Sequence, residues 1–161
     1  MIQRRPITAE TAYTRLEALC NRAEHSSGEL RKRLHTWGIA PSAAEQIIER
    51  LQAHRLLDDA RFARMFVREK IEYCGWGRRK IAVALYAKGV DRDTAAEALD
   101  DIDLESYDRH LLGIVGRKLR SLPAPDSYES RTKAFRFAVG RGFEPDRVIK
   151  AIESLKSQNK D

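Results

Sequence analysis

The sequence contains an internal repeat that aligns on three glycines, Gly38, Gly89 and Gly142. The glycines are spaced 51 and 53 residues apart, which is the length of a repeated supersecondary unit. Apolar residues recur four and eight residues before each glycine and one, six, nine, ten and thirteen residues after it. All 21 of these positions are apolar in a chain whose hydrophobic fraction is 42%. We therefore expect three copies of one folding unit.

The spacing of these apolar positions predicts the local structure of each copy. Apolar residues four apart lie on one face of a helix, and the glycine that follows can take the left-handed conformation that ends a helix. The later positions form the apolar face of another helix, which begins near Pro41, Asp91 and Pro145, because proline and aspartate suit a first turn. Each copy also has an amphipathic leading helix, expected over about residues 8–23, 59–73 and 105–120.

The predicted fold is all-α, with three tandem three-helix repeats in an elongated, curved right- or left-handed array. The predicted repeats are 1–57 with a short N-terminal tail, 58–103, and 104–161 with a short C-terminal tail. No apolar run approaches the ~20 residues of a membrane span, and the first residues lack the apolar segment of a signal peptide. With two cysteines only, the sequence favours a cytoplasmic protein. We expect a monomer that does not bind membranes.

The sequence offers little support for catalysis. The four histidines follow no metal-ligand spacing, and neither cysteine lies at ligand spacing from one of them. Gly75-x-Gly77 is too short for a nucleotide-binding fingerprint. The pair Asp58-Asp59 resembles a catalytic pair of carboxylates, but it lies where a helix begins, and helix capping accounts for it better. We expect no enzymatic activity, no cofactor and no metal site.

The distribution of cations is more informative. Arg78, Arg79 and Lys80 open a predicted helix, where the helix dipole disfavours positive charge by roughly 0.3–1 kcal/mol each. In the first copy the same interpretation places three cations in the first turn of the equivalent helix: Arg31, Lys32 and Arg33. Cations retained against this penalty suggest a phosphate or carboxylate partner. The alternative is that they belong to a solvent-exposed helix face that binds no partner. The net charge of +6 is compatible with a polyanionic partner.

Two further features bear on binding. Arg61, Arg64 and Arg68 recur at three- and four-residue spacing and form a basic stripe on the leading helix of the second copy. Trp76, between two glycines, could stack on a base or fill the seam between repeats, and the residues leave both interpretations open. Sequence-specific recognition of duplex DNA by a helix-turn-helix is disfavoured. The helix that would enter the major groove exposes carboxylates such as Glu45, which the DNA phosphates would repel.

Three strings in the middle copy resemble a known family. They are Leu57-Asp58-Asp59-Ala60-Arg61-Phe62-Ala63, Gly75-x-Gly77-Arg78-Arg79-Lys80-Ile81 and Lys88-Gly89-Val90. In this order they resemble the central segment of the RecX family, bacterial modulators of the RecA recombinase, and the similarity extends over about residues 8–155. The resemblance implies a curved array of three three-helix repeats that binds RecA and RecA–single-stranded-DNA filaments. It further implies binding in the filament groove and suppression of ATP hydrolysis and strand exchange.

The predicted function is therefore non-enzymatic regulation of RecA, as an inhibitor, with weak direct contact to single- or double-stranded DNA as an addition. The predicted partner surface consists of Arg31, Lys32, Arg33, Arg61, Arg64, Arg68, Trp76, Arg78, Arg79 and Lys80. One alternative is a sequence-independent nucleic-acid-binding repeat protein, with steeply salt-dependent binding to bare DNA. Another is a protein-interaction scaffold that is indifferent to DNA. We expect charge reversal at Arg78, Arg79 and Lys80 together to weaken filament binding and to leave the helical CD spectrum unchanged.

Overall fold

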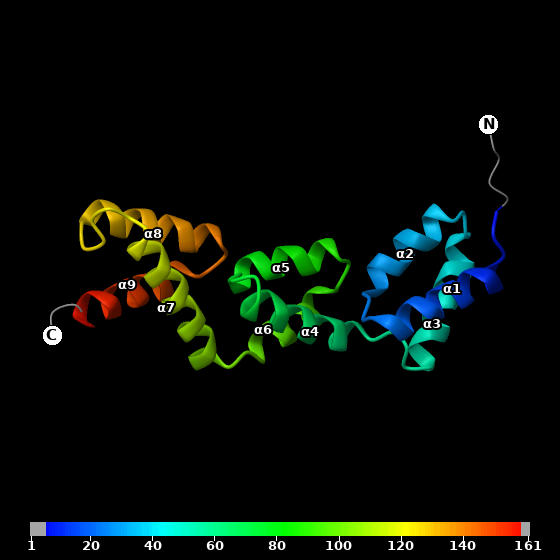
Figure 1. The fold of residues 1–161 in the computed structure, drawn as a ribbon. Helices are drawn as coiled ribbons and strands as arrows, with labels where there is room; N and C mark the ends of the chain where they lie inside the picture. Colours follow the sequence, from blue (N-terminus) through cyan, green and yellow to red (C-terminus); the bar gives the residue numbers. More distant parts are fainter. Residues whose placement is uncertain (1–5, 159–161) are drawn as a thin grey trace, which may run out of the picture. The chain divides into compact units, whose positions relative to one another are not determined.

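The computed structural model describes residues 6–158, and over this range the chain forms nine α-helices and no strand (Figure 1). The helices are α1 Ala9–Arg22, α2 Ser27–Thr36, α3 Pro41–Ala53, α4 Asp59–Glu72, α5 Arg78–Ala87, α6 Arg92–Asp100, α7 Leu104–Arg120, α8 Tyr128–Gly140 and α9 Pro145–Gln158. The all-α prediction and the three tandem three-helix repeats are confirmed. Each of the three leading helices begins and ends within one residue of its predicted bounds.

The chain divides into two compact units. Unit 1 contains the described part of Met1–Arg64 together with Leu85–Ala95, and unit 2 contains Met65–Ala84 together with the described part of Ala96–Asp161. The division passes through the middle repeat, so α4, α5 and α6 each contribute residues to both units. Each unit therefore holds one terminal repeat and the part of the middle repeat that packs against it.

The aligned apolar positions are the buried positions of the fold. The residues four and eight before each glycine are fully buried, and those directly after the glycines are at most 9% exposed. Of the 21 aligned positions, 17 are buried. The other four are half-buried: Leu99, Ile102, Ile152 and Leu155. Eleven of the 17 are large aliphatic or aromatic side chains, and burial of each contributes about 1.5–3 kcal/mol. The repeated pattern therefore supplies about half of the large buried side chains of the described core.

The three aligned glycines end their helices in the way the sequence predicts. The φ angles of Gly38, Gly89 and Gly142 are +78°, +74° and +98°, in the left-handed region. In each copy the apolar residue after the glycine donates its N–H to the carbonyl five positions earlier, at 3.0–3.2 Å. These bonds satisfy carbonyls that the helix end leaves open, and the buried apolar residue anchors the turn.

Side chains and prolines fix the helix starts. Pro41 and Pro145 are the first residues of α3 and α9, where the missing N–H carries no penalty. Asp91 Oδ1 accepts the N–H of Thr94 at 2.9 Å and caps α6. Asp58 Oδ1 accepts the N–H of the third residue of α4 at 3.1 Å. The capping interpretation of Asp58 is therefore correct.

Each unit has its own core. In unit 1, α3 packs against both α1 and α2, and the core they share includes Tyr13, Leu16 and Ile48. In unit 2, α7, α8 and α9 pack against one another. There the ring of Tyr107 on α7 lies 5.3 Å from that of Phe143, centroid to centroid, and both residues are fully buried.

Among the described helices, none combines the length and the apolar character that a membrane span requires.

Candidate functional site

In unit 1 the start of α2 lies directly against the glycine turn that follows α5. Ser26 Oγ, at the N-cap of α2, donates to the carbonyl of Lys88 at 2.6 Å. A Cβ atom on Gly28 would stand 2.6 Å from the Cα of Gly89, closer than any side chain allows. The two backbones therefore meet without an intervening side chain. We call this contact the first glycine joint.

A half-buried carboxylate holds the same joint from the side. Glu29 Oε1 pairs with Lys88 Nζ at 2.7 Å, and Oε2 lies 3.3 Å from Nδ1 of His25. Burial opposes ionisation, but the hydrogen bonds and charges of Lys88 and His25 hold the pKa of Glu29 below its ordinary value. The pattern Ser26-x-x-Glu29 is typical of a capping box, in which each side chain bonds a backbone N–H of the same helix start. Its Ser26 half is present, because Ser26 Oγ accepts the N–H of Glu29 at 3.2 Å, while the Glu29 carboxylate binds Lys88 of the next repeat.

The neighbouring aspartates have two different roles. Asp58 caps its own helix, as described above, whereas Asp59 binds the first residue of α2. The two carboxylate oxygens of Asp59 accept the N–H of Ser27 at 2.7 Å and its Oγ–H at 2.5 Å. Asp59 therefore satisfies one of the open N–H groups of a helix in the preceding repeat. The pair is a capping device for two helices.

Unit 2 contains the same kind of joint. The N–H of Gly77, which precedes α5, donates to the carbonyl of Arg141 at 2.8 Å, and the N–H of Arg79 donates to that of Gly142 at 3.1 Å. A Cβ atom on Gly77 would overlap the backbone of Gly142 and Phe143. Lys88 and Arg141 both directly precede an aligned glycine, so the acceptor is equivalent in the two copies. We call this contact the second glycine joint.

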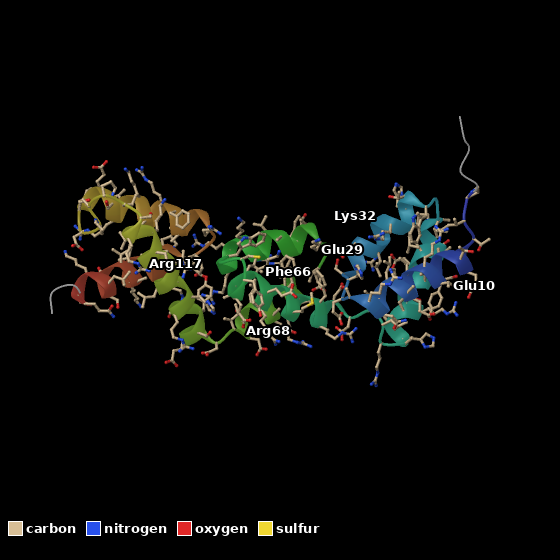
Figure 2. All side chains as sticks on the ribbon, viewed as in Figure 1. Glu10, Glu29, Lys32, Phe66, Arg68 and Arg117 are labelled. Carbon is tan, nitrogen blue, oxygen red and sulfur yellow. The ribbon has the colours of Figure 1, made fainter. Side chains whose placement is uncertain are left out.

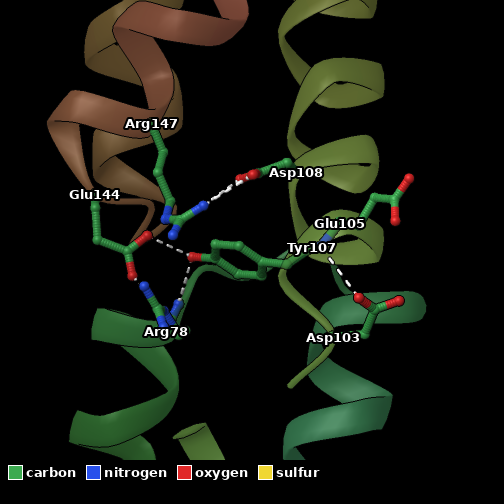
Figure 3. Close-up of polar contacts among 7 residues, drawn as sticks. All are labelled: Arg78, Asp103, Glu105, Tyr107, Asp108, Glu144 and Arg147. Atoms are coloured by element: carbon green, nitrogen blue, oxygen red, sulfur yellow. Dashed lines mark hydrogen bonds and ion pairs between the residues drawn. The ribbon is translucent and has the colours of Figure 1, made fainter. Parts of the chain in front are cut away.

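Arg78 belongs to the interior of the second joint. Its Nε donates to Oε1 of Glu144 at 2.6 Å, its backbone N–H donates to the hydroxyl of Tyr107 at 3.0 Å, and that hydroxyl donates to Glu144 Oε2 at 2.8 Å (Figure 3). The Arg78 and Glu144 side chains are 25% and 15% exposed. Arg78 is thus the one member of its triplet whose charge is neutralised by a shielded carboxylate inside unit 2.

The protonation of this cluster follows from its surroundings. Burial raises the pKa of the Tyr107 hydroxyl far above its ordinary value, so the hydroxyl keeps its proton and donates it to Glu144. Burial also opposes ionisation of Glu144, but the hydrogen bond from Arg78, supported by the Glu144 backbone and by Tyr107, holds the pKa of Glu144 below its ordinary value. Near neutral pH the cluster is therefore an arginine–carboxylate pair with a neutral tyrosine.

The other two cations of this triplet are differently placed. Arg79 and Lys80 are exposed and are the second and third residues of α5, where the helix dipole disfavours them. The Nζ atoms of Lys80 and Lys70 lie 4.4 and 4.8 Å from the ring centroid of the half-buried Trp76. The structure therefore places the ammonium groups of Lys80 and Lys70 over the ring of Trp76 at the start of α5.

The cations of α2 lie elsewhere than predicted. Because Ser26 is the N-cap, α2 begins at Ser27, and Arg31, Lys32 and Arg33 occupy its second turn, not its first. The dipole penalty falls off within one turn, so it gives no argument for a ligand at these residues. Arg31 pairs through Nε with Glu45 Oε1 at 2.7 Å. Lys32 (Figure 2) and Arg33 are exposed. Nζ of Lys32 donates to the carbonyl of Ala87 at 3.4 Å.

The basic stripe of α4 also divides into engaged and exposed members. Arg61 Nε donates to Glu24 Oε1 at 2.5 Å, so this arginine links α4 to the segment between α1 and α2 inside unit 1. Arg64 and Arg68 are exposed, and Figure 2 labels Arg68 on α4. Of the predicted surface, the exposed cations are Arg31, Lys32, Arg33 and Arg64 in unit 1, and Arg68, Arg79 and Lys80 in unit 2. Within the described range, Arg31 is the one among them that pairs with a carboxylate, that of Glu45.

Sequence reasoning missed the glycine joints, although a signal was present. Twelve residues before the aligned glycines stand Ser26, Gly77 and Ser130, all small and all buried. Small residues at one offset indicate a close backbone approach. The partners Tyr107 and Glu144 carried no such signal, since they are 29 and 66 residues from Arg78. Within the described residues, no three His, Cys, Asp or Glu side chains gather in a metal-binding arrangement.

In comparisons with known proteins, two family models match most of the first two helical repeats. Residues 12–51 match the family model of the first three-helix domain of RecX, and residues 58–99 match that of the second. The chain is 36% identical over 135 residues to the regulatory protein RecX of Chromohalobacter salexigens, covering 83% of this chain and 86% of that protein. It is 33% identical over 132 residues to that of Prosthecochloris aestuarii, covering 82% and 85%.

Other relatives are longer, and solved structures share the fold. The regulatory protein RecX of Clostridium perfringens is 31% identical over 120 residues, which span 73% of this chain and 56% of that protein. The crystal structure of RecX from Lactobacillus salivarius superimposes with a TM-score of 0.84 at 20% identity, over 91% of this chain and 96% of that one. A second crystal structure, of a regulatory protein RecX, gives a TM-score of 0.78 over 91% and 71% of the two chains.

Proposed function

The chain belongs to the RecX family, and from this premise we propose that it is a non-enzymatic regulator that binds RecA and RecA–single-stranded-DNA filaments. In this proposal it inhibits RecA ATP hydrolysis and strand exchange. The curated relatives are named regulatory proteins, which supports a role without catalysis. We assign the three repeats to residues 1–57, 58–103 and 104–161, as the sequence predicts.

The observation that carries the proposal is the pair of exposed cations, Arg79 and Lys80, in the first turn of α5. The helix dipole opposes them by roughly 0.3–1 kcal/mol each, and the ammonium of Lys80 lies over the ring of Trp76, 4.4 Å from its centroid. An aromatic ring flanked by exposed cations is a typical anchor for an anionic surface of a protein or nucleic acid. We assign this group as the centre of the contact with the filament, and the exposed Arg68 of the same unit as its supporting cation.

The test reverses the two exposed charges and leaves Arg78 in place. In Arg79→Glu/Lys80→Glu the pair of Arg78 with Glu144 is intact, so the helical CD spectrum should be that of the wild type. Binding to RecA–single-stranded-DNA filaments, measured by co-sedimentation, should weaken by about tenfold or more, which corresponds to about 1.4 kcal/mol. Reversal of Arg78 as well would place a carboxylate against Glu144 and confuse a folding defect with a binding defect.

A matched control separates local contact from total charge. Arg92→Glu/Lys150→Glu changes one exposed arginine and one exposed lysine, and so alters the net charge equally. We expect this control to bind filaments nearly as the wild type does, apart from a small general electrostatic loss. Equal weakening in the two double variants would contradict the assignment of Arg79 and Lys80.

A further inference from the structure

Unit 2 contains a pocket that the predicted partner surface does not include. It has a volume of about 460 Å³ and lies between the C-terminal end of α4 with the following turn, one face of α7, and the end of α8. This volume is within the range of about 300–1,000 Å³ that small-ligand sites occupy. We call it the α7 pocket. Its charged lining residues are Glu72, Arg109, Arg117, Lys118 and Arg141.

The α7 pocket has a large excess of positive charge. Three arginines and a lysine line it, together with His110, against the single carboxylate of Glu72. Arg109 has a further carboxylate partner in Glu105, at 3.7 Å, but both side chains are well exposed, at 65% and 84%. The interaction free energy of such exposed ion pairs is small, so Glu105 does little to offset the charge of Arg109. Four cations around one space repel one another, and an anion that enters it relieves that repulsion.

Neutral groups hold two of these cations in place. Arg141 Nη1 donates to the carbonyl of Cys74 at 3.1 Å, and its guanidinium lies 5.1 Å from the ring centroid of Phe137. Lys118 Nζ lies 4.8 Å from the same ring. A carbonyl and an aromatic face orient a cation but do not cancel its charge. The cations of Arg141 and Lys118 are therefore held in position, and their charges remain available to a ligand anion.

Besides Arg141 and Lys118, the pocket has a third cation in Arg117, which lies on α7 (Figure 2). It is exposed, and its Nη1 lies 3.5 Å from where a Cβ on Gly113 would stand. The missing side chain of Gly113, one turn earlier, leaves room for the guanidinium to lie along the helix beside the pocket.

An exposed aromatic ring completes the lining. Tyr73 follows the last residue of α4, is 82% exposed and is one of the pocket's lining residues. Large exposed aromatic rings beside cations are the pattern of single-stranded nucleic-acid sites, in which bases stack on the ring and phosphates bind the cations. In a duplex the bases are already stacked on one another, so the ring favours an unpaired strand.

We propose that the α7 pocket binds single-stranded DNA, with one phosphodiester between Arg117, Lys118 and Arg141 and an adjacent base stacked on Tyr73. The proposal deepens the proposed function and rests on it for the source of the strand, which is the DNA of the RecA filament. It assigns direct DNA contact to unit 2, at residues separate from the Arg79 and Lys80 contact.

The experiment measures binding of bare oligothymidylate, labelled with fluorescein, by anisotropy across a salt series and without RecA. In Arg117→Gln/Lys118→Gln we expect at least about tenfold weaker binding, and a salt slope smaller by about 0.7, the contribution of the one phosphate contact that a single strand makes in this pocket. The matched control, Arg136→Gln/Lys150→Gln, removes one exposed arginine and one exposed lysine outside the pocket. Its slope should stay close to that of the wild type. An equal change of slope in both would overturn the proposal.

A second variant tests the stacking contact. Tyr73→Ala should weaken single-strand binding by about 5- to 150-fold, the equivalent of about 1–3 kcal/mol per stacked base, and leave the salt slope unchanged. Binding of the paired duplex should not change, and an equal loss on the duplex would overturn the base-stacking assignment. If the mononucleotide dTMP competes as well as the oligomer per nucleotide, the pocket is a nucleotide site and the strand proposal is wrong.

The outcomes also separate this proposal from the proposed function. If Arg117→Gln/Lys118→Gln binds bare DNA as the wild type does while Arg79→Glu/Lys80→Glu loses filament binding, the pocket assignment fails and RecA regulation stands. If the pocket variants lose DNA binding while the wild type has no effect on RecA, the pocket stands and the regulatory proposal fails.

Discussion

At the scale of single residues, Glu144 connects three helices of unit 2, two through its carboxylate and one through its backbone carbonyl. It accepts hydrogen bonds from Arg78 at the start of α5 and from Tyr107 on α7. Its own carbonyl accepts the N–H of Val148 in α9 at 3.0 Å. Removing the charge leaves the half-buried guanidinium of Arg78 without its partner, and this is a larger penalty than the loss of an exposed ion pair.

We therefore expect Glu144→Gln to lower the free energy of unfolding by about 1.5–3 kcal/mol, the range for hydrogen bonds to charged groups. Urea unfolding at neutral pH, followed by far-UV CD, measures this change. Glu153→Gln removes an exposed carboxylate from α9 and should stay within about 0.5 kcal/mol of the wild type. Similar stabilities for the two variants would show that the cluster does not hold unit 2 together.

The pH dependence of stability has a defined sign. Glu144 and Glu29 both have folded-state pKa values below the ordinary one. Such a carboxylate stabilises the fold fully above its unfolded pKa of about 4.3, and its contribution is lost as the pH falls through the lower folded value. We expect the wild type to lose stability below about pH 4.3 and Glu144→Gln to lose it less steeply. Urea unfolding from about pH 6 to about pH 3 tests this, and parallel curves would contradict it.

Residue roles were the least predictable level, for a physical reason. A dipole argument from sequence requires the helix start to be known to within one turn. For α5 the glycines gave that start, and Arg79 and Lys80 lie where expected. For α2 the N-cap at Ser26 moved Arg31 out of the first turn. The engagement of Arg78 depends on Glu144, a partner far along the chain that no local pattern indicates.

At the scale of elements, the glycine joints determine how neighbouring repeats meet inside each unit. Gly77 is the stricter case, because its backbone lies directly against that of Gly142 and Phe143. Backbone atoms cannot move aside as a flexible side chain can. The joint therefore accepts no side chain at this position, whatever its chemistry.

We expect Gly77→Ala to destabilise the protein by about 1–3 kcal/mol or more, the usual effect of overpacking a close contact. Gly140→Ala is the matched control, since a Cβ on Gly140, the last residue of α8, meets no atom within 4 Å. In the control, alanine should be neutral or stabilising by up to about 1 kcal/mol. Thermal unfolding of the two variants provides the measurement. Equal unfolding midpoints would contradict the claim that the second glycine joint accepts no side chain at residue 77.

The helices themselves were predictable because their signals are local. Apolar spacing, proline at a first turn and glycine at a stop each act within about one or two turns. The division into two compact units was not predictable in this way. It depends on which turn packs against which helix start, and the offset shared by Ser26 and Gly77 becomes informative only once the joints are known.

At the scale of the whole molecule, the net charge of +6 attracts any polyanion, so affinity for bare DNA does not by itself identify the partner. A contact with three phosphates of a single strand should lose about 20-fold in affinity between about 50 and about 200 mM salt. A contact made largely with RecA protein should lose less. We therefore expect filament binding to persist at the higher salt when bare-DNA binding has largely disappeared. Parallel losses for the two ligands would favour a general nucleic-acid binder.

The most direct test of RecA regulation is the rate of ATP hydrolysis by RecA on single-stranded DNA, titrated with this protein at concentrations well below that of RecA. The account predicts inhibition by the wild type and by Arg92→Glu/Lys150→Glu, and weaker inhibition by Arg79→Glu/Lys80→Glu. An unchanged rate of hydrolysis at every ratio, with binding to bare DNA intact, would contradict it.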